Sequence, residues 1–315
     1  MGTAAIYELP VPIWISTDAL EGRIPAGLGS FAFDVVMPGR GGAYGTPPTL
    51  EGVSVPAQNP ESKETLVWSQ RFAAFTPGPD SASTALCRIV VQTQSSGNPD
   101  SERYDLSRII GLWFDAVRTW VEAVTGQDLD PNHRVYTAVV HGANLLFVDP
   151  PRTSDGPVGM TLTTPQILPL SAENWHAILG FVAAGTEIPL EEQLSRDSRA
   201  AFARGHLRRS IIDAASAAEI VLHRVLSAQA SPGDMPNGAL RRKLETLDKQ
   251  PLGGLVTLAR AANLDLGIEL DALEELSEVR NAAIHRGEDA DYERASRTVQ
   301  GAIDLIGTHG AWKRP

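Results

Sequence analysis

The stretch that decides the fold of the C-terminal half is residues 273–287, LEELSEVRNAAIHRG. Its apolar residues recur with the 3.6-residue period of an amphipathic helix, and charged residues lie between them. Gly287 can adopt the left-handed conformation that commonly ends a helix. The pattern therefore predicts a helix with Arg280, Asn281 and His285 in its last two turns.

Arg280, Asn281 and His285 form the pattern with the clearest chemical potential. In a regular α-helix, Asn281 and His285 share one face because they are four residues apart, whereas Arg280 lies about 140° round the helix from His285. Arginine beside a histidine that titrates near neutrality suits a form of phosphodiester chemistry that requires no metal. The alternative interpretation is that Arg280 and His285 only complement the negative end of the helix dipole.

The composition indicates a soluble globular protein. The 315 residues are 43% hydrophobic and 21% charged, and they suffice for one large or two ordinary domains. No apolar run is as long as a membrane span, and the sequence MGTAAIYELP lacks the basic start and apolar core of a signal peptide. We therefore expect a cytoplasmic protein that makes no membrane contact.

The cysteine and histidine content argues against a metal. Cys87 is the only cysteine, which excludes a disulfide within the chain and a zinc site with several cysteines. We interpret Cys87 as a buried structural thiol because it lies in an apolar run. The seven histidines do not have the spacing of metal ligands. We therefore expect no metal and no other cofactor.

Negative charge is concentrated in the N-terminal half of the chain. Residues 1–194 contain 10 Lys and Arg against 21 Asp and Glu, a net charge of −11, whereas residues 195–315 contain 17 of each, a net charge of zero. This asymmetry favours two domains, which we place at residues 1–187 and 188–315. It also argues against the first domain as a nucleic-acid clamp, because phosphate binding needs clustered positive charge.

The fold class predicted for the whole chain is α+β, with a mixed α+β domain first. In that domain the apolar stripe of Asp105–Gly126 predicts one long helix, whose tryptophans we expect to fill a core against a sheet rather than to stack on bases. Turns rich in Pro and Gly separate four candidate strands. These strands are Val11–Ser16, Ser30–Met37, Thr65–Phe75 and Ala85–Thr93.

Two loops of the N-terminal half contain residues that could bind a ligand. Residues 37–48, MPGRGGAYGTPP, lack the Gly-Lys-Ser/Thr ending and the following helix of a phosphate-binding loop, so we expect a surface loop. Val135–Val140 and Leu145–Val148 have the pattern of a hairpin, with His141 and Asn144 in its turn. Both of these polar residues are expected to be turn residues, with a ligand site as the alternative.

After residue 170 the pattern is wholly helical. Glu219 lies on the apolar side of one predicted helix, where a carboxylate is costly unless it is paired, and Arg280 is the candidate cation. Basic residues gather at 204–209 and 241–243, either as solvated helix faces or as RNA contacts. The predicted helices are Ala172–Ala184, Glu191–Arg204, His206–Gln229, Ala239–Lys249, Leu252–Ala262, Glu269–Arg286 and Asp291–Thr308.

On these residues the C-terminal half resembles a HEPN domain, a small helical bundle found in many prokaryotic defence and toxin systems. Residues 280–285, RNAAIH, are similar to the family signature of Arg, four to six residues and His, with a polar residue after the Arg. One more amphipathic helix follows in ADYERASRTVQGAIDLI. Residues 211–226, IIDAASAAEIVLHRVL, are similar to the long helix of the Apea-like branch. The resemblance covers residues 191–310 and not the N-terminal half.

The resemblance implies a function, because many HEPN proteins are metal-independent endoribonucleases that work as dimers. It implies that His285 is a general acid or base, that Arg280 stabilises charge on the phosphate, and that Asn281 orients the phosphate or the histidine. Glu219 is a further candidate for the catalytic site. The implied partners are RNA, with tRNA among the candidates, and a second copy bound through the helical domain. The N-terminal domain would bind a trigger or an inhibitor.

Three functions are consistent with the sequence. The first is an RNA-cleaving effector of anti-phage defence, abortive infection or a toxin–antitoxin system. The second is a non-catalytic HEPN module for dimerisation and for binding a ligand or RNA. The third is a structural adaptor in which Arg280 and His285 only cap a helix. The first is chemically coherent, because RNA supplies its own nucleophile in the 2′-OH and the protein need only move protons and stabilise charge.

Overall fold

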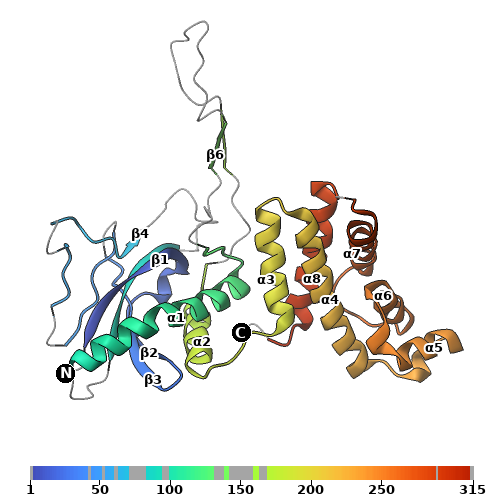
Figure 1. The fold of residues 1–315 in the computed structure, drawn as a ribbon, viewed down its shortest axis with the longest axis horizontal. Coiled ribbons are helices and arrows are strands. Elements are labelled where there is room, and N and C mark those ends of the chain that lie inside the picture. Colours follow the sequence, from blue (N-terminus) through green and yellow to red (C-terminus); the bar gives the residue numbers. More distant parts are fainter. Residues whose placement is uncertain are drawn as a thin grey trace, which may run out of the picture. The chain divides into compact units, whose positions relative to one another are not determined.

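The computed structural model describes residues 3–41, 44–51, 54–59, 63–70, 83–93, 99–130, 138–141, 159–162, 169–288 and 290–312. The chain divides into two compact units, Met1–Thr186 and Glu187–Pro315. The first contains an antiparallel sheet and the second is helical (Figure 1), which is consistent with the α+β class.

The sheet of the first unit is antiparallel, with strand order β1-β5-β3-β2. A short fifth strand, β4, pairs with the first part of β5, whereas β3 pairs with its last residues. The strands are β1 (Ala4–Ser16), β2 (Arg23–Leu28), β3 (Phe31–Val36), β4 (Ser69–Gln70) and β5 (Ser83–Thr93), and a 3-10 turn, η1 (Thr17–Ala19), follows β1.

The structure differs from the predicted strands in three places. β1 begins seven residues before the predicted Val11, and the described part of the predicted Thr65–Phe75 strand contains only the two residues of β4. β2 was not predicted, because Pro25 and Gly27 both disfavour a strand. Its place at the edge of the sheet explains why proline is tolerated there, since an edge strand has one side free of ladder hydrogen bonds.

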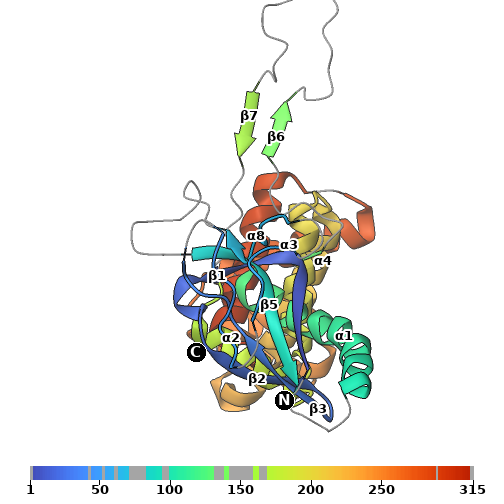
Figure 2. The same ribbon diagram turned by 90° about the vertical axis from the view of Figure 1, so that its left-hand side faces the viewer.

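Two helices pack with this sheet, α1 (Pro99–Thr125) and α2 (Ala172–Ala183). Trp113 of α1 is fully buried, and its ring meets the rings of Tyr7 in β1 and Phe33 in β3 edge-on, at centroid distances of 6.5 and 5.4 Å. Trp120 of α1 packs on Phe181 of α2 at 4.8 Å. Figure 2 shows α1 lying along the sheet. The prediction that the tryptophans of this helix fill a core is confirmed.

The expected hairpin of residues 135–148 is wrong in its pairing. β6 (Ala138–His141) pairs antiparallel with β7 (Gly159–Leu162), far beyond the predicted partner strand. His141 lies opposite Gly159 in this ladder and is therefore a strand residue, not a turn residue. Asn144 and the predicted strand Leu145–Val148 lie outside the described residues.

The second unit is built around α4, which packs against α3, α6, α7 and α8. The buried face of α4 contains four alanines, Ala214, Ala215, Ala217 and Ala218, whose small side chains allow neighbouring helices to approach closely. The elements are α3 (Leu190–Ala203), α4 (Leu207–Gln229), η2 (Pro232–Asp234), α5 (Gly238–Glu245), η3 (Leu247–Lys249), α6 (Leu252–Ala261), α7 (Leu270–Asn281), η4 (Ala282–Arg286) and α8 (Tyr292–His309).

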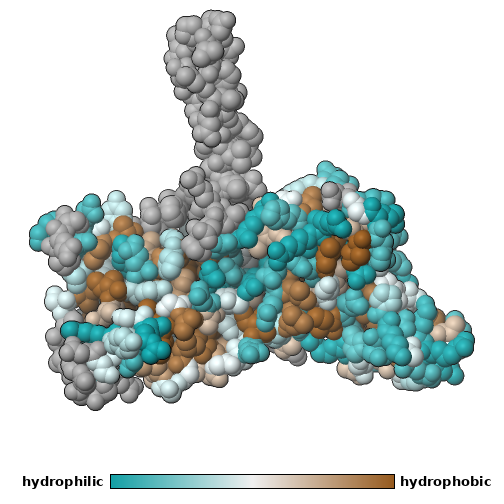
Figure 3. All heavy atoms as spheres, viewed as in Figure 1, coloured by the Kyte–Doolittle hydropathy of each residue, from teal (hydrophilic) through white to brown (hydrophobic). Residues whose placement is uncertain are grey.

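One face of this unit is mostly polar (Figure 3). On the face drawn in Figure 3, hydrophilic side chains predominate over α3–α8, because the apolar residues of these helices point into the shared core. No helix in the described part of the chain is long and apolar enough to cross a membrane.

A buried carboxylate connects three helices of the second unit. Glu191, at the start of α3, is 3% exposed and accepts hydrogen bonds from Arg224 Nη1 of α4 at 2.6 Å and from the Ala311 N–H at 3.0 Å. Arg224 Nη2 also donates to the carbonyl oxygen of His309 at 2.7 Å. Burial by itself would raise the pKa of Glu191, but the hydrogen bonds from Arg224 and from backbone N–H groups outweigh it and lower that pKa.

Glu191→Gln is expected to lower the free energy of unfolding by about 1–2 kcal/mol near neutral pH, because the half-exposed Arg224 loses its charged partner. A carboxyl group with a lowered folded-state pKa stabilises the protein above its unfolded pKa, and this stabilisation is lost as the pH falls through the folded pKa. Urea denaturation followed by circular dichroism should therefore show the difference from wild type shrinking in acid. Glu293→Gln, on the surface of α8, is the matched control with no expected effect. A difference that stays constant down to pH about 3 would contradict the assignment to the charge of Glu191.

Candidate functional site

The residues 280–285 lie where α7 changes its helical type. α7 ends at Asn281 and continues as η4, a π-helical turn that contains His285. Gly287 then has a φ of +68° and its N–H donates to the carbonyl oxygen of Ala282, a bond across five residues. The predicted left-handed ending at Gly287 is confirmed, whereas the regular helix predicted through Arg286 is not.

The π turn changes which side chains face each other. A π-helical turn takes more residues than an α-helical one, because its hydrogen bonds join residues five apart. The angle between Arg280 and His285 therefore falls below the roughly 140° of a regular α-helix. We therefore expect His285 to lie closer in direction to Arg280 than it would in a regular α-helix.

The three side chains are accessible and form few contacts with the rest of the protein. Asn281 and His285 are exposed and Arg280 is half-buried. Arg280 Nη1 donates to Asn281 Oδ1 at 3.2 Å, and no carboxylate among the described residues forms an ion pair with Arg280. Within the same set of residues, the His285 ring has no hydrogen-bond partner. The site therefore offers unused donors from a guanidinium, an amide and an imidazole.

Other cations near the motif are already paired. Arg286 donates to both carboxylate oxygens of Glu288, at 2.7 and 3.2 Å, and this pairing raises the pKa of Arg286 and lowers that of Glu288. Glu275 of α7 accepts from Arg297 and Arg294 of α8, whose hydrogen bonds lower its pKa. Since these arginines are engaged, Arg280 is the guanidinium of this helix end that can bind an incoming anion.

Glu219 does not join this group. It is half-buried on α4, and the structure gives it no ion pair with Arg280 in the described part of the chain. The predicted Glu219–Arg280 pair is therefore not formed within one chain. The reason is exposure, since a carboxylate that keeps contact with water needs no cation to offset desolvation. Only the sequence pattern supports a role for Glu219 in catalysis.

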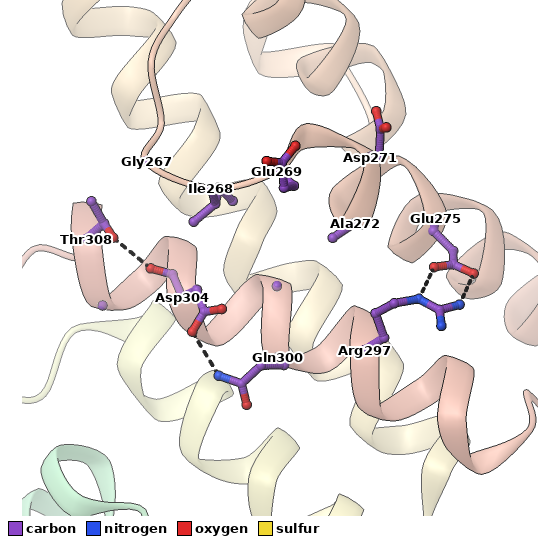
Figure 4. A pocket seen from close by; sticks show the side chains of 12 residues that line it. Gly267, Ile268, Glu269, Asp271, Ala272, Glu275, Arg297, Gln300, Asp304 and Thr308 are labelled. Atoms are coloured by element: carbon purple, nitrogen blue, oxygen red, sulfur yellow. Dashed lines mark hydrogen bonds and ion pairs between the residues drawn. The ribbon is translucent and has the colours of Figure 1, made fainter.

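A separate groove is lined by residues 267–275, at and just before the start of α7, and by residues 297–308 of α8 (Figure 4). Its volume is about 860 Å³, and it contains none of the residues 280–285. Its lining includes Glu269, Asp271, Glu275 and Asp304, whereas its one arginine, Arg297, is paired with Glu275 at 2.8 Å. This excess of carboxylates disfavours phosphate binding, so we do not place RNA in this groove.

The remaining candidate residues do not form a site. Cys87 is half-buried rather than fully buried, and burial raises its pKa despite the opposing effect of Arg88. A raised pKa disfavours the thiolate that a nucleophile requires. Among the described residues, no group of three or more His, Cys, Asp and Glu side chains is arranged to hold a metal.

The comparisons with known proteins give no match: no family model, no curated protein and no solved structure matches this chain.

Proposed function

We propose that the chain is a metal-independent endoribonuclease whose active site contains Arg280, Asn281 and His285. The observation that carries the proposal is that Asn281 and His285 are exposed beside the half-buried Arg280 at one helix end, with Arg280 free of carboxylate partners among the described residues. The resemblance of residues 280–285 to the HEPN signature supports the same conclusion. In this proposal the second unit is the HEPN-like helical bundle.

The proposed reaction is transfer of the phosphate within the RNA chain. His285 acts as a general base and takes the proton of the ribose 2′-OH, whose oxygen attacks the neighbouring phosphorus. Arg280 stabilises the negative charge that develops on the non-bridging oxygens, and Asn281 orients the phosphate through its amide N–H groups. The bond between phosphorus and the 5′-oxygen breaks, and that oxygen takes up a proton. The products carry a 2′,3′-cyclic phosphate and a 5′-OH.

A homodimer would supply the second proton-transfer group. One histidine cannot be deprotonated as the base and protonated as the acid at the same instant, so we assign the acid to His285 of a second copy.

In the same proposal, the first unit binds a trigger or an inhibitor, and the protein acts in anti-phage defence or in a toxin–antitoxin system. The negative charge of residues 1–194 supports a regulatory role for this half, because it disfavours direct contact with RNA.

A specific observation favours a second candidate function, an RNA-binding or dimerisation module without catalysis. In catalytic histidines the second ring nitrogen is commonly hydrogen-bonded, which sets the tautomer and the ring orientation. His285 has no such bond among the described residues of a single chain. In the catalytic proposal, this orienting contact comes from the second copy or from the substrate.

Incubation of the purified protein with total RNA and a tRNA pool in EDTA tests the proposal. We expect cleavage that leaves 2′,3′-cyclic phosphate and 5′-OH ends, detected by the sensitivity of the ends to phosphatase and kinase. A matched oligonucleotide with 2′-deoxyribose at the cleavage position should remain intact, because it lacks the nucleophile. Cleavage of this control, or activity that EDTA abolishes, would contradict the mechanism.

A further inference from the structure

The hairpin between α3 and α4, residues 204–209, has the sequence RGHLRR. Arg204, His206, Arg208 and Arg209 are all exposed, and no acidic residue occurs between positions 198 and 212. Arg209 is paired with Asp213 at 3.4 Å, whereas Arg208 has no partner among the described residues. An open cavity of about 480 Å³ is lined by Gly205, His206, Leu207, Arg208, Arg209 and Ile212. Positive charge and concave shape therefore coincide at this hairpin.

The hairpin lies at the same end of the helical unit as the Arg280–His285 site. Phe202, at the end of α3, packs on Tyr292, the first residue of α8, with ring centroids 5.0 Å apart. Only residues 287–291 separate Tyr292 from the π turn η4, which also contacts α4. Figures 1 and 2 both show the α3–α4 turn and the start of α8 at one end of the unit.

Tyr292 adds a second kind of contact. Its side chain is 61% exposed, although one side of its ring rests on Phe202 with an interplanar angle of 40°. An aromatic ring that is held in place and remains exposed can stack on an unpaired base. Positively charged side chains beside such rings are the usual means by which proteins bind single-stranded nucleic acid without reading its sequence.

We propose that the α3–α4 hairpin and Tyr292 form the surface that holds single-stranded RNA as it enters the Arg280–His285 site. Arg208 binds a phosphate and Tyr292 stacks on a base. The helical half is close to neutral overall, so this local cluster, not the net charge, supplies the attraction. The inference rests on the proposed function, since it names the part of the same site that binds the substrate.

Binding of a fluorescein-labelled single-stranded RNA of about 20 nucleotides tests this surface by fluorescence anisotropy in EDTA. The full chain carries His285→Ala so that the RNA stays intact during the measurement. We expect Arg208→Ala to weaken binding several-fold and to reduce the slope of log Kobs against log [salt] by about 0.7, the value for one phosphate contact on a single strand. Tyr292→Leu keeps an apolar contact for Phe202 and should weaken binding about tenfold with an unchanged salt slope.

Arg242→Ala is the matched control, because it removes one exposed positive charge from α5, whose contacts are with α6 and η2. The proposed surface would be overturned if Arg242→Ala weakened RNA binding as much as Arg208→Ala does. It would also be overturned if neither Arg208→Ala nor Tyr292→Leu changed RNA binding, or if the protein did not bind RNA. If the chain with native His285 cleaves RNA at the same rate with and without Arg208→Ala and Tyr292→Leu, the surface is overturned and the catalytic proposal stands. Hairpin-dependent binding without cleavage would overturn the catalytic proposal and leave the surface.

Discussion

His285→Ala is expected to reduce RNA cleavage by about 10²- to 10⁴-fold, the contribution typical of a positioned general acid or base. In a dimer that uses both histidines, the substitution removes the base and the acid together, so the loss should lie at the upper end of this range. Stability should change by no more than about 0.5 kcal/mol, because His285 is exposed and has no hydrogen-bond partner among the described residues. The measurement is the initial rate of cleavage in EDTA, together with urea denaturation of the same preparations.

His176→Ala is the matched control for this experiment. His176 is an exposed helical histidine like His285, but it lies on α2 in the other unit. We expect the rate of the His176→Ala variant to equal that of wild type. If His285→Ala also cleaves at the wild-type rate, His285 has no part in the mechanism. If both variants lose activity equally, the loss does not report on the site.

Trp113→Ala is expected to lower the free energy of unfolding by about 3–5 kcal/mol, the largest effect on stability among these predictions. Trp113 is fully buried, and it joins α1 to the sheet through Tyr7 and Phe33. Its removal leaves a cavity in a closely packed core, which the neighbouring rings can fill only in part. Urea denaturation followed by circular dichroism should show the sheet-containing unit unfolding at lower urea concentration.

Trp113→Phe provides the comparison for this substitution. The phenyl ring keeps most of the contacts with Tyr7 and Phe33, and it removes an indole N–H for which the described residues provide no acceptor. Its cost should therefore be well below that of alanine. If both variants unfold at the wild-type urea concentration, Trp113 does not join α1 to the sheet in solution.

The local sequence pattern was enough to predict helices that bury one face along their length. The apolar stripes of α1 and α4 marked both helices, since one face of each is buried along its length. β2 was missed because Pro25 is acceptable only at the edge of a sheet, and the sequence does not reveal which strand occupies the edge. The pairing of β6 with β7 was missed for a similar reason, because short hairpins are favoured locally and longer connections leave no pattern.

Some features of the candidate site could also be predicted from the sequence, whereas others could not. The position of Arg280, Asn281 and His285 at a helix end could be predicted because Gly287 marks that end. The π turn could not, since Ala282, Ala283 and Ile284 contain no helix-breaking residue. The predicted Glu219–Arg280 pair failed because helical periodicity gives a direction round the axis but not the exposed fraction of a side chain. Proximity of the hairpin to Tyr292 depends on tertiary packing alone.

The hydrogen bond between Glu191 and the N–H of Ala311 has a consequence for how this protein can be rearranged. It joins the first turn of α3 to the residues that follow α8, so the path of the helical unit begins and ends at one place. A domain with adjacent ends can be spliced into another chain through short joints that do not distort its interior. The helical unit therefore has a geometry suited to insertion into other proteins by protein engineering.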